Sequence, residues 1–352
     1  MNSSTTRVRL AVLLGDPAGI GPELIAKLLS NEANRHRADL FLIGDRNEVD
    51  EGMRIAGARF PYVEAERFEA ARFEPGVPVL MHFRGGAKAP FARAQASENG
   101  GVYSLDAFRE ALKLTAGNDT QGMLFAPVNK TSMHMAGMET GDEMEWFARQ
   151  LDYRGPCSEF NVIEELWTSR VTSHVALRRV GDLITEEKII AAIRLITDGL
   201  RRAGIARPRI GVCGLNPHNG DDGSFGREEL DVIGPAVLRA QSLGLPAEGP
   251  LPADTIFVRA LRRGEFDGVV TMYHDQGQIA MKLMGFERGV TVHGGLPIPV
   301  TTPAHGTAFD IYGQGKAHAG ATQNAFDIVC RMAENRLADA GAVQAHAGHP
   351  ST

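Results

Sequence analysis

Residues 268–278 read GVVTMYHDQGQ, an apolar run that ends abruptly in polar residues and a glycine. The run GVVTM is short and has no charged residue, which is typical of a strand that is buried on both faces. Similar runs occur at residues 8–14, 40–43, 123–128 and 209–213. These runs predict the strands of a sheet that is covered on both sides.

Longer segments with helical period separate the apolar runs. They cover residues 22–31, 105–116, 186–203, 228–242, 255–263 and 324–338. Thr185, followed by two glutamates, resembles a helix cap with an acidic first turn, and Gly204 stands where that helix should end. Strands that alternate with helices predict an α/β fold with a mainly parallel sheet.

The length and composition of the chain indicate a globular protein with two domains. Its 352 residues exceed the size at which single hydrophobic cores stop growing. With 43% hydrophobic and 23% charged residues, it has an ordinary soluble composition. The net charge of -6 gives no indication of nucleic acid or of an anionic membrane, so we expect small molecules as partners.

The three cysteines of the chain are Cys157, Cys213 and Cys330. They stand far apart and in no CxxC spacing, so neither a disulfide framework nor a cysteine zinc site is indicated. The apolar stretch near the start meets GDP at residues 15–17 too early for a signal sequence or a membrane span. We therefore expect a cytoplasmic protein, whose last residues, 346–352, form a frayed tail.

Ligands of such sheets bind outside the carboxyl ends of the strands, so the segments after the apolar runs are informative. GDPAGIGPE, residues 15–23, fits no dinucleotide or Walker pattern and is either a tight turn or a ligand loop. Asn129 and Lys130 follow another run, where a lysine either meets an anionic substrate or is solvated. TTPAHGTAFDIYGQGKA, residues 301–317, has glycines around a His and an Asp, as in a ligand loop or a long turn.

Three histidines stand at or near predicted strand ends. His218 lies in NPHNGDDGSFGREE, and His274 lies in YHDQ, where Asp275 follows it. His174, in RVTSHVAL, stands in a strand-like stretch, where a lone histidine more often packs than binds a ligand. Three neutral imidazoles can hold one divalent ion and leave positions for substrate oxygens. Because their spacing matches no local zinc motif, their convergence depends on the fold.

Together, these motifs identify the sequence as a member of a known family. GDPAGIGPE, APVNK, NPHNGDDGSFGREE, YHDQGQ and HGTAFDIYGQGKA occur in this order in the 4-hydroxythreonine-4-phosphate dehydrogenase (PdxA) family of vitamin B6 biosynthesis, and the resemblance spans residues 8–333. It implies two α/β/α domains similar to those of isocitrate and isopropylmalate dehydrogenases, with the active site in a cleft. It also implies an obligate homodimer that shares its active site between subunits. We assign residues 1–135 and 295–345 to the cofactor-side domain, and residues 136–294 to the domain for metal, substrate and dimerisation.

The resemblance also implies the chemistry and the site residues. NAD or NADP oxidises a hydroxyl β to a carboxylate, and carbon dioxide is then lost. A divalent metal, with zinc favoured over magnesium or manganese, is held by His174, His218 and His274. The cofactor loop contributes His305, Gly306, Thr307, Ala308 and Asp310. Asn129 and Lys130 contact the substrate, and a glycine turn after His274 brings Lys282 to the same cleft, where Lys282 and Asp275 are the expected catalytic residues.

Several substrate positions depart from the family pattern. Glu143 and Met144 stand where the family has a histidine and a threonine. Thr291 and Val300 stand where it has an asparagine and an arginine that grip phosphate, and Ala304 stands where it has an aspartate. A valine cannot replace a bidentate guanidinium, and a glutamate adds negative charge where a phosphorylated substrate would bind.

These departures predict a substrate other than the usual one. The leading expectation is the oxidative decarboxylation of a different β-hydroxy acid, such as terephthalate 1,2-cis-dihydrodiol, the substrate of a paralogue that lacks the phosphate-binding arginine. The alternatives are 4-hydroxythreonine-4-phosphate itself, another sugar acid or sugar-acid phosphate, and a catalytically idle relative that only binds a ligand.

Overall fold

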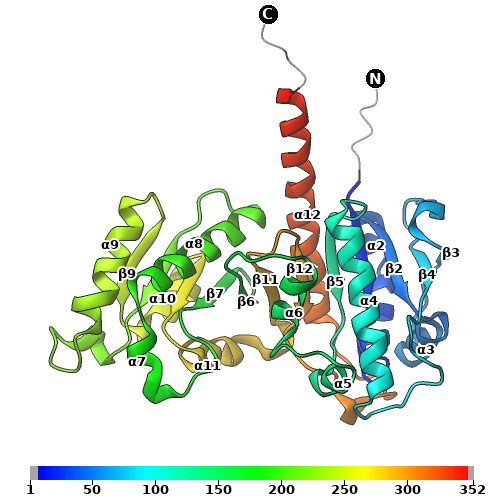
Figure 1. Ribbon diagram of the computed structural model, residues 1–352, viewed down its shortest axis with the longest axis horizontal. Coiled ribbons are helices and arrows are strands. Elements are labelled where there is room, and N and C mark those ends of the chain that lie inside the picture. The colour runs from blue at the N-terminus through cyan, green and yellow to red at the C-terminus, as the bar shows by residue number, and fades with distance from the viewer. Residues whose placement is uncertain (1–6, 348–352) are drawn as a thin grey trace, which may run out of the picture. The chain divides into compact units, whose positions relative to one another are not determined.

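The computed structural model describes residues 7–347, which form two compact units (Figure 1). The first unit combines Met1–Arg154 with Leu296–Thr352, and the second unit is the continuous segment Gly155–Gly295. The expected tail at 346–352 lies outside the described residues, except for two residues that belong to the last helix. No helix within the described range is both long enough and apolar enough to cross a membrane.

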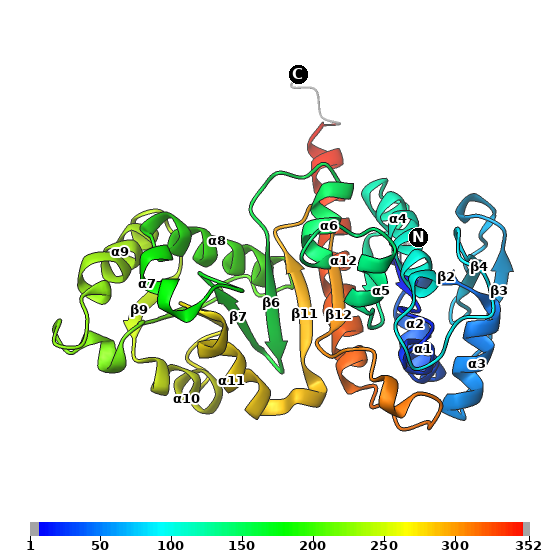
Figure 2. The ribbon, with the colours of Figure 1, turned by 60° about the horizontal axis from the view of Figure 1, so that its bottom comes forward.

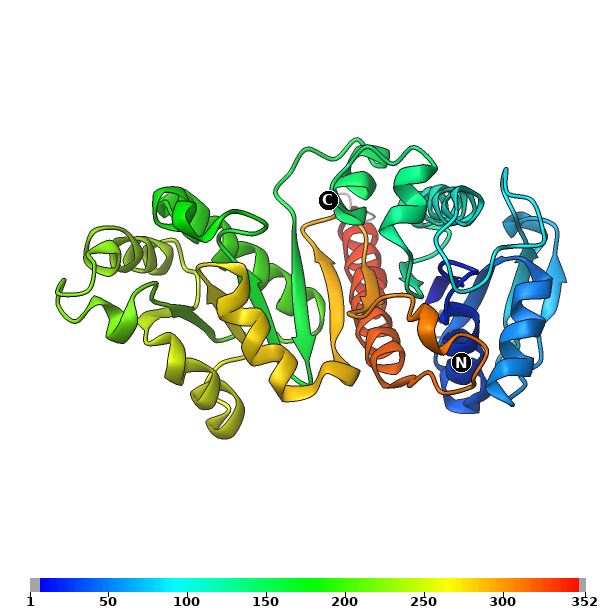
Figure 3. The ribbon, with the colours of Figure 1, turned by 90° about the horizontal axis from the view of Figure 1, so that it is seen from below.

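Within residues 7–154 and 296–347, the first unit has a parallel sheet in the order β3-β4-β2-β1-β5-β12. The strands are β1 (Arg9–Leu13), β2 (Asp39–Gly44), β3 (Val63–Ala65), β4 (Val79–His82), β5 (Gly122–Phe125) and β12 (Val300–Pro303). The helices are α1 (Gly21–Ser30), α2 (Glu32–Arg37), α3 (Arg46–Ala56), α4 (Glu98–Ala116), α5 (Lys130–Met135), α6 (Glu143–Gln150) and α12 (Gly320–Ala347). Helices α4 and α1 lie on opposite sides of these strands (Figure 3).

The second unit has the strand order β11-β6-β7-β10-β8-β9, in which β6 runs antiparallel to β7 and β11. The strands are β6 (Ser158–Ile163), β7 (Leu166–Arg170), β8 (Ile210–Cys213), β9 (Ala247–Leu251), β10 (Gly268–Thr271) and β11 (Val290–Gly294). The helices are α7 (Val180–Leu183), α8 (Glu186–Arg202), α9 (Gly234–Ser242), α10 (Ala253–Arg263) and α11 (His274–Gly285). Helix α8 covers one face of the sheet, and α10 and α11 cover the other (Figure 2).

The predicted strands and helices are confirmed. The apolar runs form β1, β2, β5, β8 and β10, whose residues are almost all buried. Helix α4 starts before its predicted range because the side chain of Ser97 caps it. The Thr185 side chain accepts a hydrogen bond from the amide of Lys188 and so caps α8, as expected. The α/β class with a mainly parallel sheet is therefore correct.

Two local expectations around the histidines are wrong. Residues 274–285 form α11 and no glycine turn. Gly277 lies in the first turn of this helix, and a Cβ atom there would come within 3.2 Å of Thr271 Cγ2, so the glycine permits close packing of the helix on β10. His174 does not belong to a strand, because β7 ends at Arg170 and the histidine lies in the following loop with a φ of 31°.

An aromatic cluster determines where the first unit ends along the chain. Phe147 of α6 contacts Phe108 of α4 and Phe125 of β5, with ring centroids 4.9 and 5.8 Å apart and the rings nearly perpendicular. Such edge-to-face pairs add to the stabilisation from apolar burial. Because α6 packs into this core, the boundary falls at 154/155, whereas the sequence expectation placed it at 135/136.

Candidate active site

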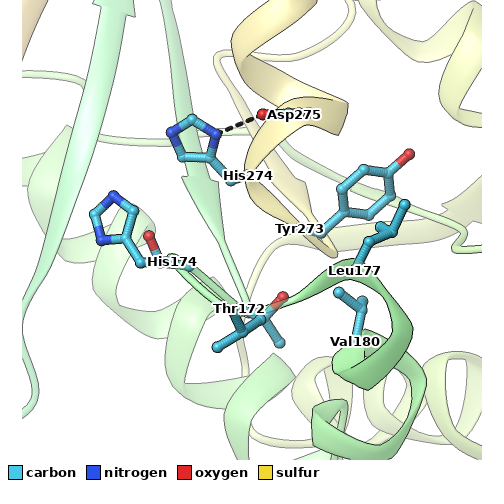
Figure 4. A pocket seen from close by; sticks show the side chains of 9 residues that line it. Thr172, His174, Leu177, Val180, Tyr273, His274 and Asp275 are labelled. Atoms are coloured by element: carbon cyan, nitrogen blue, oxygen red, sulfur yellow. Dashed lines mark hydrogen bonds and ion pairs between the residues drawn. The ribbon is translucent and has the colours of Figure 1, made fainter.

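A cavity of about 380 Å³ lies in the second unit at the carboxyl ends of β7 and β10 (Figure 4). The loop after β7 lines it with Thr172, Ser173, His174, Val175, Leu177 and Val180, and the segment after β10 lines it with Tyr273, His274 and Asp275. Since β7 and β10 pair with each other, these two distant segments of the sequence meet at one edge of the sheet. This edge is where parallel sheets bind their ligands.

His174 and His274 lie next to each other in this cavity. Their ring centroids are 5.7 Å apart, and Figure 4 shows both rings beside the same opening. Nδ1 of His274 lies 2.7 Å from a carboxylate oxygen of Asp275. With Nδ1 bound to that carboxylate, Nε2 of His274 keeps its lone pair for a ligand. This pair of imidazoles fits a divalent metal ion.

His218 lies at the carboxyl end of β8, in a strained loop outside the lining of the cavity. Residues 218–223 all have positive φ angles, an arrangement that non-glycine residues rarely adopt. Buried Glu229 holds the loop by accepting hydrogen bonds from the amides of Leu215 and Asn216, at 2.7 and 2.6 Å. Strain of this kind persists only where surrounding contacts enforce it.

The structure therefore brings together two of the three expected metal ligands, His174 and His274. Among the residues that the structure describes, no three His, Cys, Asp or Glu side chains are close enough to form one metal site. His218 belongs to the same unit but is exposed and does not line the cavity. The three-histidine set remains a prediction.

Lys282 lies on α11, eight residues after His274. Eight helical residues correspond to a rise of about 12 Å, so the lysine is about two turns away from the histidine. Its side chain is exposed and does not line the cavity. The catalytic role of Lys282 remains a prediction, whereas Asp275 contacts His274 directly.

In the first unit, Lys130 forms an ion pair with Glu143. Their charged atoms are 3.5 Å apart, with the lysine side chain half exposed and the glutamate side chain 11% exposed. Asn129 caps α5, because its side-chain oxygen accepts a hydrogen bond from the amide of Ser132 at 2.9 Å. Met144 follows Glu143 in α6 and is partly buried. The sequence motifs gave no signal for the Lys130–Glu143 pair.

Thr291 and Val300 stand at the expected phosphate positions. Thr291 lies on β11, where it is partly exposed and paired with Asn161 of β6. Val300 opens β12, is paired with Met123 of β5 and is fully buried. Val300 is therefore a core residue in this protein, and its position offers no polar group to a substrate.

The predicted cofactor loop packs against the GDPAGIGPE segment. The carbonyl of buried Thr307 accepts a hydrogen bond from the amide of Ile20 at 3.1 Å. A Cβ atom at Gly19 would come within 2.7 Å of Thr307, so only glycine permits this approach. Ala308 has a φ of 44°, which is strained for a residue with a Cβ atom. Asp310 is exposed.

His305 stands at the start of this loop and faces a desolvating environment. Burial lowers the pKa of its imidazole, and a hydrogen bond with the Gly306 carbonyl partly offsets that effect. The imidazole nitrogen and the carbonyl oxygen are 3.1 Å apart. Burial at this position therefore favours the neutral form of the imidazole.

Asp16 is a buried carboxylate that the motif interpretation did not single out. Its Oδ1 accepts a hydrogen bond from the amide of Ala18 at 2.8 Å. Burial raises the pKa of Asp16, an effect that the Ala18 amide and the Ser132 hydroxyl partly offset. Ser132 also bonds to Asn129, so Asp16 supports the turn that carries Asn129 and Lys130.

Comparison with known proteins defines the class of this protein. The chain is 59% identical to a Pseudomonas aeruginosa protein provisionally named 4-hydroxythreonine-4-phosphate dehydrogenase 2. The match covers 93% of this chain and 98% of the relative. It is 35% identical over 92% of its length, and 98% of the relative's, to the D-threonate 4-phosphate dehydrogenase of Salmonella typhimurium. The chain is thus an NAD(P)-dependent dehydrogenase.

The family follows from the same comparisons. The family described as pyridoxal phosphate biosynthetic protein PdxA matches residues 36–329, and the chain belongs to it. The crystal structure of 4-hydroxythreonine-4-phosphate dehydrogenase from Klebsiella pneumoniae has the same fold, with a TM-score of 0.81 and 32% identity. That match covers 94% of this chain and 100% of the Klebsiella chain.

Proposed function

We propose that this dehydrogenase oxidises and decarboxylates a four-carbon hydroxy acid that carries a phosphate ester. The supporting observation is its identity, over nearly its whole length, with relatives named for 4-hydroxythreonine-4-phosphate and D-threonate 4-phosphate. Both compounds have a hydroxyl β to a carboxylate and a phosphate on C4. They differ at C2, which carries an amino group in the first and a hydroxyl in the second.

The comparisons do not support the expected terephthalate dihydrodiol as substrate. A terephthalate 1,2-cis-dihydrodiol dehydrogenase from Burkholderia xenovorans is only 22% identical to this chain, which establishes a common fold and nothing about the substrate. The expectation rested largely on the missing arginine at Val300. Val300 is fully buried in the sheet, so the phosphate of such a substrate would be held by other groups.

The cavity of the second unit supports a metal site built on His174 and His274, completed by His218 of the same or a second copy. A divalent ion held there would lower the pKa of the substrate hydroxyl and stabilise the negative charge that develops during decarboxylation. Asp275 orients the imidazole of His274. Imidazole ligands favour zinc, with magnesium and manganese as the alternatives.

We also propose that the protein is a homodimer with an active site shared between subunits. Ile279 and Leu283 stand four residues apart on α11 and are 60% and 84% exposed. Residues at this spacing share one face of α11, which is exposed at both positions. Large apolar side chains on such a face fit a protein interface on the helix that begins with His274.

The remaining predicted residues have roles that follow from their chemistry. Lys130 and Lys282 are cations for the carboxylate and phosphate of the substrate. Glu143 already balances part of the Lys130 charge, so substrate binding must compete with this ion pair. The loop with His305, Gly306, Thr307, Ala308 and Asp310 would hold NAD or NADP.

A substrate panel tests the proposed function. We expect NADH or NADPH formation with 4-phosphohydroxy-L-threonine or D-threonate 4-phosphate, with kcat/KM at least about tenfold above that for the terephthalate dihydrodiol. Parallel assays with zinc, magnesium and manganese identify the metal. Faster turnover of the dihydrodiol than of both phosphorylated compounds would contradict the proposal.

Metal content tests the assignment of the histidines. His174→Ala and His274→Ala should each remove most of the bound metal, as measured by elemental analysis of the purified protein. Asp275→Asn should weaken metal affinity by about tenfold, because it removes the group that orients His274. His36→Ala, at an exposed position of the first unit, is the matched control. Full metal occupancy in both histidine variants would refute the assignment.

A further inference from the structure

We propose that Glu23 and Lys27 of α1 form a buried clamp that positions the cofactor loop, so that the loop is ordered before NAD(P) binds. The clamp is defined here as these two side chains and their bonds to residues 315–317. This inference rests on the proposed function, because it takes residues 305–310 as the cofactor loop. It assigns a role to the end of GDPAGIGPE, a motif that the proposed function leaves unused.

The contacts of the clamp join α1 to residues that stand between 288 and 294 positions later in the sequence. Nζ of Lys27 donates hydrogen bonds to Glu23 Oε1 at 2.7 Å, to the Gly315 carbonyl at 2.8 Å and to the Ala317 carbonyl at 2.7 Å. Glu23 Oε1 also accepts a hydrogen bond from the amide of Ala317 at 2.9 Å. Figures 2 and 3 show the orange loop segment beside the blue helix α1.

The chemistry of the pair matches a fixed clamp more closely than an ordinary helix ion pair. An ammonium group has three donors, and all three donors of Lys27 are used. The Glu23 side chain is 2% exposed and the Lys27 side chain is 23% exposed, so water competes little for these bonds. Within the described residues, Glu23 Oε2 has no hydrogen-bond partner, so the carboxylate depends on the lysine for compensation.

A second anchor fixes the other end of the loop. Thr307 is held by the hydrogen bond to Ile20 at the start of α1, and the loop then passes through Ala308 in a left-handed conformation. Gly315 has a φ of 69°, and a Cβ atom added to it would lie 2.9 Å from the carbonyl oxygen of Ile55. The glycine therefore allows the loop to pass close to that carbonyl. Both ends of residues 307–317 are thus tied to one helix, while Asp310 between them is exposed.

Holding a loop in its binding conformation lowers the entropy lost when a ligand binds. The clamp fixes one end of the loop, the Thr307–Ile20 bond fixes the other, and Asp310 between them stays exposed. Loss of the clamp should therefore weaken NAD(P) binding without changing the cavity of the second unit. Lys27 and Glu23 are positioning residues, since neither reaches the exposed part of the loop.

The test compares Lys27→Met and Glu23→Gln with the full-length wild-type protein. We expect the Kd for NAD(P), measured by titration calorimetry without substrate, to rise by roughly tenfold in each variant. The KM for NAD(P) should rise in parallel, with kcat and metal content close to those of the wild type. Amide hydrogen exchange should become faster in residues 305–319. Lys27→Gln, which keeps donor groups, should restore part of the affinity.

Lys113→Met, an exposed lysine near the end of α4, is the matched control and should leave all of these quantities unchanged. Wild-type cofactor affinity and wild-type exchange rates in Lys27→Met would overturn the clamp. If the wild type binds neither NAD nor NADP, the proposed function fails. The hydrogen-exchange data alone then decide whether Glu23 and Lys27 hold the loop. Faster exchange confined to residues 305–319 would still support the clamp, and unchanged exchange would refute it.

Discussion

Asp16 is a fully buried carboxylate, and its Oδ2 has no hydrogen-bond partner among the described residues. Burial raises its pKa, so the fold favours the protonated form and is destabilised when the group ionises at higher pH. Asp16→Asn should therefore raise the free energy of unfolding at neutral pH by about 1 kcal/mol. The gain should disappear below about pH 4, where an aspartic acid in the unfolded chain is itself protonated. Urea unfolding at both pH values measures this.

Asp198→Asn is the control for this prediction, because Asp198 is half exposed on α8. It should change the free energy of unfolding little at either pH. A loss of stability in Asp16→Asn at neutral pH would mean that the hydrogen bonds of the carboxylate outweigh its desolvation. Proteins keep a residue that lowers their stability where it serves binding or catalysis, so a destabilising Asp16 would fit such a role.

Among the contacts between secondary-structure elements, that of α4 with α5 depends on Gly101. A Cβ atom there would come within 1.9 Å of the Ser132 carbonyl and 2.9 Å of the Ala136 Cβ. Gly101→Ala should therefore force the helices apart and lower the free energy of unfolding by about 1–3 kcal/mol. Because α5 begins at Lys130, kcat/KM should fall as well. Thermal unfolding and steady-state kinetics measure both effects.

Gly341→Ala on α12 is the matched substitution, since nothing lies within 4 Å of an added Cβ atom. It should leave kcat/KM unchanged and stabilise the helix by up to about 1 kcal/mol. Equal thermal stability of the two alanine variants would contradict the account of the α4–α5 contact.

The exposed apolar face of α11 yields a prediction for the whole molecule. If Ile279 and Leu283 lie in a dimer interface, Leu283→Glu places a charge there and should shift the protein to monomers in sedimentation experiments. Activity should fall together with dimerisation, because the proposed site is shared. Leu238→Glu, at a 67% exposed position of α9, should do neither. A monomeric wild type with full activity would refute both the dimer and the shared site.

The α/β class follows from the sequence alone, because buried strands and amphipathic helices are local patterns that the chain carries in its residue order. The sequence also indicated the helix cap at Thr185, the family and the segments that follow the strands. It predicted a turn after His274, because a glycine can stand either in a turn or in a closely packed helix and the sequence does not show which. These residues form α11 instead, in which Gly277 packs closely on Thr271 of β10.

Which of these segments meet depends on the tertiary structure. His174 and His274 lie one hundred residues apart in sequence and come together because β7 pairs with β10. The ion pair of Lys130 with Glu143 and the bonds of Lys27 to Gly315 and Ala317 have the same origin. Such contacts depend on strand order and helix packing, which no local periodicity records, and they decide the geometry of the site.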